Sequence, residues 1–199
     1  MGAPPVFWWL DAYCKWTGRP YYVALQSAAS EFGTTPQAIQ VVQVMTDLKR
    51  RDLLLGRLRV QFFVKTQIGA TQTQLLPNAY APLIISTPEA TCLDLVRYAP
   101  RVGGIERAME TIEPLLRRLD RRRLLDALKM QNDLRTLQRF GFILDILKFH
   151  KLSAAIRRQL PVQLTIVALE THLGNPGQVL TRVDAQWGIE VRSNFRGCT

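Results

Sequence analysis

The segment LIISTPEATCLDLVRY (residues 83–98) joins an apolar run to a cluster of Ser, Thr, Glu, Cys and Asp side chains. Thr87 is suited to cap a helix, and Pro88 fits the first helical position that follows a cap. Glu89 places a negative charge near the positive end of the helix dipole. The segment therefore predicts a strand that leads directly into a helix beginning at Pro88.

The helical spacing of the same segment predicts which side chains are buried. Leu93, Val96 and Cys92 are expected to face the core, and Asp94 and Arg97 to face solvent. A nucleophilic Cys92 would need a nearby base. The two histidines, His150 and His172, lie in no recognisable Cys/His motif. We therefore interpret the cluster as a structural joint, with a catalytic site as the alternative.

The residues before the joint read mostly as strands. IQVVQVMT (39–46) is typical of a strand buried on both faces, and LKRRD is expected to be an exposed turn. GRLRVQFFVKT (56–66) alternates apolar and polar residues, and only Phe63 interrupts the polar face. TQTQLL and PLIIS predict two more strands, whereas YYVALQSAASEFG (21–33) predicts a short helix ending at Gly33.

Beyond the joint the apolar residues recur at helical spacing. One helix is predicted over 105–119, kinked or split at Pro114. Asp120 is suited to cap the next helix. Further helices are expected around 134–147 and in KLSAAIRRQL (151–160). QLTIVALE and WGIEVR return to strand character, with a turn at Asn175, Pro176 and Gly177.

This order of strands, helices and strands predicts an α+β fold. We expect a mixed or antiparallel sheet from the N-terminal and C-terminal strands, packed against a central set of helices. The chain has 199 residues, of which 47% are hydrophobic, as in an ordinary globular protein. Its apolar runs are too short to span a membrane, and its start, MGAPPVFWWLDAY, does not resemble a signal peptide. A cytoplasmic location without membrane association is therefore expected.

The charge balance is the strongest feature of the composition. Lys and Arg number 26 against 16 Asp and Glu, which gives a formal net charge of +10. Such a balance is expected of a protein that meets phosphate groups or an acidic partner. The three cysteines are widely spaced and form neither a disulfide framework nor a paired metal-ligand motif.

Two groups of basic residues are candidates for binding DNA, RNA or an acidic partner. The hairpin group surrounds the predicted 56–66 strand, and a two-stranded ribbon fits a DNA major groove. The helical group spans a helix boundary, where Glu113, Asp120 and Asp126 could partly neutralise it as an ordinary solvated face. The hairpin group comprises Lys49, Arg50, Arg51, Arg57, Arg59 and Lys65, and the helical group comprises Arg117, Arg118, Arg121, Arg122 and Arg123.

Catalytic motifs are scarce. The sequence has no phosphate-binding Gly-rich loop, no dinucleotide fingerprint and no zinc spacing. Asp47 and Lys49 form an acid-x-Lys triplet after a strand, as in some metal-dependent nucleases. A solvated turn explains the same residues, so the nuclease remains an alternative. We expect a protein that is not an enzyme and that needs no cofactor or metal.

The sequence also resembles the AbiEi antitoxins of abortive-infection AbiE systems, which are transcriptional regulators of type IV toxin–antitoxin pairs. The resemblance rests on the order of five segments along nearly the whole chain. It implies a bacterial antitoxin that counters a nucleotidyltransferase toxin without a stable complex, and that represses its own operon. The segments are GRPYYVALQSAASEFG (18–33), QVVQVMTDLKRR (40–51), GRLRVQFFVK (56–65), ISTPEATCLDLVRY followed by GGI (85–105), and WGIEVRSN (187–194).

The chain departs from that family at its N-terminal end. AbiEi proteins usually carry a winged helix-turn-helix before the antitoxin domain, and only about twenty residues precede the resemblance here. We expect residues 18–199 to form a single antitoxin domain and residues 1–17 to be a helical remnant or linker. PVFWWLDAYCKW (5–16) could form one amphipathic helix, which is too little for a winged domain.

Overall fold

The computed structural model describes residues 4–34, 41–76, 82–170 and 181–195. The chain divides into two compact units, Met1–Cys92 and Leu93–Thr199. The predicted α+β class is confirmed, and the strands of the two ends belong to two separate sheets. The division into 1–17 and 18–199 stays a prediction.

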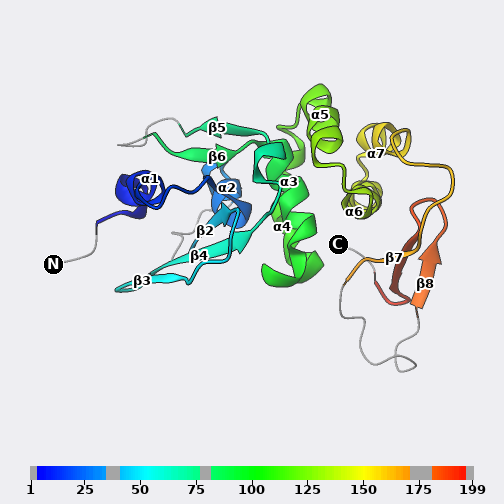
Figure 1. Ribbon diagram of the computed structural model, residues 1–199. Helices are drawn as coiled ribbons and strands as arrows, with labels where there is room; N and C mark the ends of the chain where they lie inside the picture. The colour runs from blue at the N-terminus through cyan, green and yellow to red at the C-terminus, as the bar shows by residue number, and fades with distance from the viewer. Residues whose placement is uncertain (1–3, 35–40, 77–81, 171–180, 196–199) are drawn as a thin grey trace. The chain divides into compact units, whose positions relative to one another are not determined.

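The first unit is built on a mixed six-stranded sheet in the order β3-β4-β2-β1-β6-β5 (Figure 1). β1 is parallel to β6 and β2 is parallel to β4, whereas the other neighbours are antiparallel. The four strands predicted between residues 39 and 86 are confirmed as β2, β4, β5 and β6, whereas β3 was not predicted. The strands are β1 (Tyr21–Val23), β2 (Val41–Thr46), β3 (Leu53–Leu55), β4 (Leu58–Val64), β5 (Thr73–Leu75) and β6 (Ile84–Ser86).

Two helices accompany this sheet, α1 (Val6–Trp16) and α2 (Leu25–Glu31), with a short 3-10 turn at Ile68–Ala70. Val6, Leu10 and Cys14 of α1 join the buried core of the sheet. The predicted helix over 21–33 is wrong in its first turn, because residues 21–23 form β1 between β2 and β6. Aromatic and β-branched residues favour a buried strand over the helix that their spacing suggested. Gly33 has a φ of 75°, as expected of a residue that follows a helix end.

The strand-to-helix joint is confirmed. β6 ends at Ser86 and α3 (Pro88–Arg97) begins two residues later. The Ala90 N–H donates to Thr87 Oγ1 at 3.3 Å, which is the expected cap. The prediction for Asp94 is wrong, because its exposed fraction is 0%. All side chains from 89 to 96 are buried, so this part of α3 has no solvent face for Asp94 to occupy.

The second unit contains helices and a three-stranded sheet in the order β7-β9-β8. α6 packs against α7, β7 and β9. α4 contains Pro114 but ends at Leu116, before the predicted Leu119. The elements are a 3-10 turn (Ala99–Arg101), α4 (Gly104–Leu116), α5 (Arg121–Gln131), α6 (Leu134–Ile146), α7 (His150–Arg157), β7 (Val167–Ala168), β8 (Thr181–Asp184) and β9 (Ile189–Arg192).

β8 of the second unit was not predicted from the sequence. The predicted turn at 175–177 lies outside the described residues. In the part of the chain that the structure describes, no helix has the length and apolar character needed to cross a bilayer.

Candidate nucleic-acid interface

The helical group lies across the turn between α4 and α5, with Arg117 and Arg118 directly after α4 and Arg121, Arg122 and Arg123 in the first turn of α5. Asp120 caps this helix as predicted, since its Oδ1 accepts the N–H of Arg123 at 2.9 Å. All five arginines of the group are exposed. None of them forms an ion pair with an acidic residue of the described chain. Their guanidinium groups are therefore available to an external anion.

The position of this group is electrostatically unfavourable for the helix. Cations repel the positive end of a helix dipole, and Arg121, Arg122 and Arg123 occupy the first turn of α5. The helix is held instead by its buried residues Leu124, Ala127 and Leu128. The arginines thus do not stabilise α5, and a bound polyanion would relieve their repulsion.

The hairpin group is partly engaged in contacts within the first unit. Arg59 donates from Nε and Nη2 to Asp52 Oδ2, at 3.0 and 2.6 Å. The other carboxylate oxygen of Asp52 accepts the N–H of Phe62 at 3.2 Å. Arg59 therefore helps to fix β4 to the residues before β3, and its charge is balanced.

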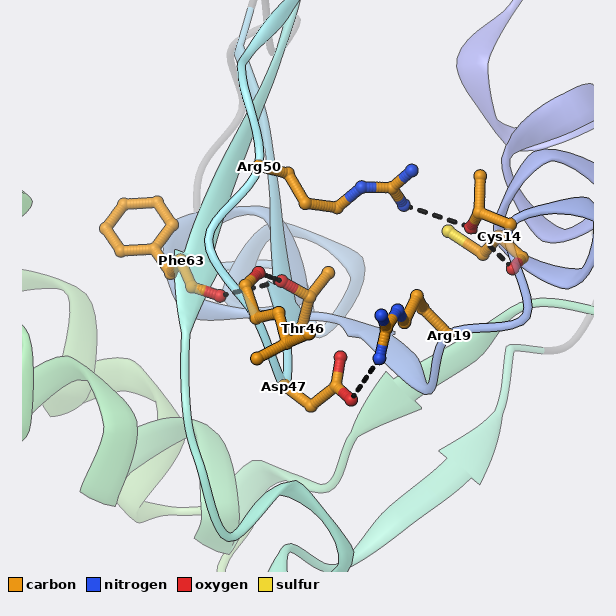
Figure 2. A network of polar contacts seen from close by, with 8 residues as sticks. Cys14, Arg19, Thr46, Asp47, Arg50 and Phe63 are labelled. Carbon is orange, nitrogen blue, oxygen red and sulfur yellow. Dashed lines mark hydrogen bonds and ion pairs between the residues drawn. The ribbon is translucent and has the colours of Figure 1, made fainter.

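Arg50 is also committed to an internal contact. Figure 2 shows its side chain extending toward α1, beside Cys14. It donates to Thr17 Oγ1 at 3.1 Å and to the Tyr13 hydroxyl at 3.3 Å. Its guanidinium carbon lies 5.0 Å from the centroid of the Tyr13 ring and 5.3 Å from that of Phe62. Arg50 thus joins the turn after β2 to α1.

Lys65 lies inside the first unit, contrary to its expected place on the polar face of the 56–66 strand. Its exposed fraction is 3%, and its Nζ is 6.0 Å from the centroid of the Tyr22 ring. Alternation fails here because Phe63, at the opposite parity to Phe62, is also buried. Lys49, Arg51 and Arg57 remain exposed, with no ion pair in the described chain.

Asp47 of the acid-x-Lys triplet already has a partner within the first unit. Asp47 Oδ2 lies 3.4 Å from Nη1 of Arg19, a pair visible in Figure 2 that the sequence did not predict. Arg19 lies 28 positions away in sequence, so only the fold reveals the contact. Among the described residues no group of three or more His, Cys, Asp and Glu could hold a metal ion.

The thiols and histidines have other surroundings. Burial, followed by the nearby Glu89 charge, raises the pKa of the Cys92 thiol, so the thiol is protonated at neutral pH. Burial also raises the pKa of Cys14 to about 11. His150 Nδ1 lies 3.3 Å from Asp145 Oδ1, and His172 lies outside the described residues.

A solved structure has a fold similar to that of this chain. The crystal structure of the RV2827C protein from Mycobacterium tuberculosis superposes with a TM-score of 0.65 at 13% identity, covering 94% of this chain and 68% of that one. At that identity the likeness shows a shared fold. A search of curated proteins finds no match.

Residues 21–146, from the start of β1 to the end of α6, match the AbiEi antitoxin C-terminal domain. The chain therefore belongs to the family of AbiEi antitoxin C-terminal domains.

Proposed function

We propose that this protein is a non-enzymatic antitoxin of a type IV toxin–antitoxin system, which counters a nucleotidyltransferase toxin without forming a stable complex with it. The family match carries this proposal, because it covers the complete sheet of the first unit and continues through α6. Family membership supports an antitoxin-type regulatory role, and the resemblance to AbiEi antitoxins supplies the class of toxin.

We further propose that the exposed basic residues contribute to autoregulation by contacting DNA phosphates. The helical group supplies five cations without acidic partners in the described chain, and Lys49, Arg51 and Arg57 supply three more. Phosphate contacts of this kind give affinity and orientation but no sequence preference. Any preference for an operator would need base contacts in addition.

Co-expression with a neighbouring nucleotidyltransferase toxin tests the antitoxin role. We expect the wild-type chain to restore growth to cells that express the toxin. A variant with Arg117, Arg118, Arg121 and Arg122 changed to Gln serves as the comparison, because these side chains make no internal ion pair. We expect it to restore growth while losing affinity for DNA. Absence of rescue by well-expressed wild-type protein would contradict the antitoxin role.

Two measurements on the purified protein test the rest of the proposal. Affinity for duplex DNA should fall steeply between about 50 and 200 mM salt, because bound phosphates release counterions. A flat salt response would contradict phosphate binding. Incubation of nucleic acid with the protein and Mg²⁺ or Mn²⁺ should leave it intact, whereas cleavage would support the nuclease alternative at Asp47 and Lys49.

A further inference from the structure

Helix α1 presents large aromatic side chains to solvent. Trp16 is 83% exposed and Trp8 is 49% exposed. They are eight residues apart, with exposed Ala12 midway, so they share the outer face of the helix. The inner face of α1 is already occupied, because Val6, Leu10 and Cys14 belong to the buried core. Trp16, with most of its surface exposed, is therefore not needed to anchor α1.

A row of ring contacts leads along α1 to Trp16. The Trp9 and Tyr13 centroids are 6.0 Å apart in an edge-to-face arrangement, and those of Tyr13 and Trp16 are 6.4 Å apart. Tyr13 is fixed from the other side by Arg50, which donates to its hydroxyl. The row is thus held in place at its middle, and its last ring is open to solvent.

The same arginine brings further cations close to this row. Arg50 donates to Tyr13 and Thr17, so its chain neighbours Lys49 and Arg51 follow a segment that is fixed to the C-terminal end of α1. Both neighbours are exposed and have no ion pair within the described chain. Exposed rings and cations without an ion pair therefore lie on two segments that Arg50 joins.

An apolar hollow lies between α1 and β3, which is an edge strand of the sheet. It has a volume of about 400 Å³ and is lined by Pro4, Trp9, Tyr13 and residues 53–55. Arg51 and Arg57 lie two residues before and after β3. This apolar hollow, with cations on both sides of β3 in the sequence, suits a flat aromatic base that is attached to a negatively charged phosphate backbone.

We infer that α1 and the turn after β2 form a binding surface for single-stranded nucleic acid. Bases stack on Trp16 and enter the hollow beside Trp9, while Lys49, Arg51 and Arg57 contact the phosphates. A duplex cannot use the rings in this way because its bases are already stacked on one another. The surface consists of residues of the first unit, whereas the helical group belongs to the second, and the inference does not depend on the antitoxin role.

Two other occupants are possible for an exposed apolar patch, namely a second copy of the chain and an apolar peptide. The charges favour nucleic acid. The acids of this surface are already paired, Asp11 with Lys15 at 2.7 Å and Asp52 with Arg59 at 2.6 Å. The remaining cations repel a second copy that carries the same charges, and they match a polyanion.

Fluorescence anisotropy with labelled oligo(dT) and oligo(U) of about 12 nucleotides tests the inference, with a duplex of equal length as reference. We expect Trp16→Leu to weaken single-strand binding roughly 5- to 100-fold and to leave duplex binding unchanged. Trp16→Tyr should retain most of the single-strand affinity, because it keeps a stacking ring. Trp16→Leu keeps an apolar side chain, so it separates stacking from simple apolar contact.

Changes outside the surface provide the controls. Arg121→Gln with Arg122→Gln should lower duplex binding and leave the single-strand affinity nearly unchanged. The inference is overturned if the wild type fails to bind both oligonucleotides at low salt, or if Trp16→Leu binds them as well as Trp16→Tyr does. It is also overturned if sedimentation shows self-association that requires Trp16 and that excludes the oligonucleotides. Growth rescue by Trp16→Leu, measured separately, reports on the antitoxin role alone.

Discussion

The polar side chains around Asp145, at the end of α6, and the arginines of the helical group, between α4 and α5, have opposite surroundings. Asp145 accepts hydrogen bonds from Ser153, from Gln186 Nε2 at 2.9 Å and from Trp187 Nε1 at 2.7 Å. His150 adds a contact at 3.3 Å. The helical group, in contrast, has no acidic partner in the described chain.

This difference separates polar residues that build the fold from polar residues that can bind a ligand. The Asp145 cluster, formed by Asp145 with His150, Ser153, Gln186 and Trp187, joins α6 and α7 to the residues before β9. Both carboxylate oxygens of Asp145 already have partners. Losing such a group leaves buried donors without an acceptor, which destabilises the protein. Removing an unpaired surface cation leaves nothing unsatisfied. The two regions should therefore respond oppositely to substitution.

The largest expected loss of stability comes from Gly141→Ala, which disturbs Trp187 of the Asp145 cluster. A Cβ at this position would lie 2.0 Å from Cζ3 of Trp187, and both residues are buried. Because the indole is also tied to Asp145, it cannot move away without breaking that bond. We expect a loss of about 3 kcal/mol or more in the free energy of unfolding, measured by chemical denaturation.

Gly69→Ala is the matched control for Gly141→Ala. A Cβ at Gly69 meets nothing within 4 Å. Its stability should therefore stay within about 0.5 kcal/mol of the wild type. An equally mild result for Gly141→Ala would show that Trp187 does not pack tightly on α6.

The next largest effect is expected from Asp145→Asn. The amide keeps one acceptor oxygen where the carboxylate has two, so either the N–H groups of Gln186 and Trp187 or the hydroxyl of Ser153 lose their acceptor, and the negative charge is lost. We expect a loss of about 2 kcal/mol in the free energy of unfolding. Asp126→Asn is the control, because Asp126 is exposed and has no partner in the described chain. Equal stability of the two variants would contradict the structural role of Asp145.

Asp120 combines features of both regions. It makes a structural hydrogen bond as the cap of α5, and its neighbours in sequence are the arginines of the helical group. Asp120→Ala removes the acceptor for the Arg123 N–H and should lower stability by about 1 kcal/mol. Asp120→Ser keeps a capping oxygen without the charge and should lie closer to the wild type. Thermal unfolding of both variants separates the cap from the charge, and an Ala variant as stable as the Ser variant would argue against the cap.

Local signals made the joints of the fold predictable from the sequence. Thr87 with Pro88, and Asp120 before its helix, act through bonds to residues only three positions away. Tyr21–Val23 was misread as helix because a three-residue strand is too short to show its own period. Its identity depends on β2 and β6, which are distant in sequence.

The burial of charged residues could not be predicted from the sequence. Lys65 and Asp94 were expected at the surface, since a single charged residue gives no sign of being enclosed by other elements. Arg50 and Arg59 belong to the predicted hairpin group, but Arg50 donates to Tyr13 and Arg59 donates to Asp52. The sequence did not show that these two side chains have internal partners. The Asp145 cluster was missed because it joins residues 41 and 42 positions apart.

The smallest effect on stability, and the sharpest test of the comparison, is expected from Arg121→Gln combined with Arg122→Gln. Both side chains lie at the positive end of α5, so their removal should leave stability unchanged or slightly higher. Duplex DNA affinity should fall, and the slope of log affinity against log salt should decrease by about 0.9 for each phosphate that the variant no longer neutralises. Lys129→Gln with Arg135→Gln removes the same charge from exposed positions outside the group. If both double variants weaken binding equally, only net charge matters. If the first weakens it more, the cations at the start of α5 form a localised phosphate-binding surface.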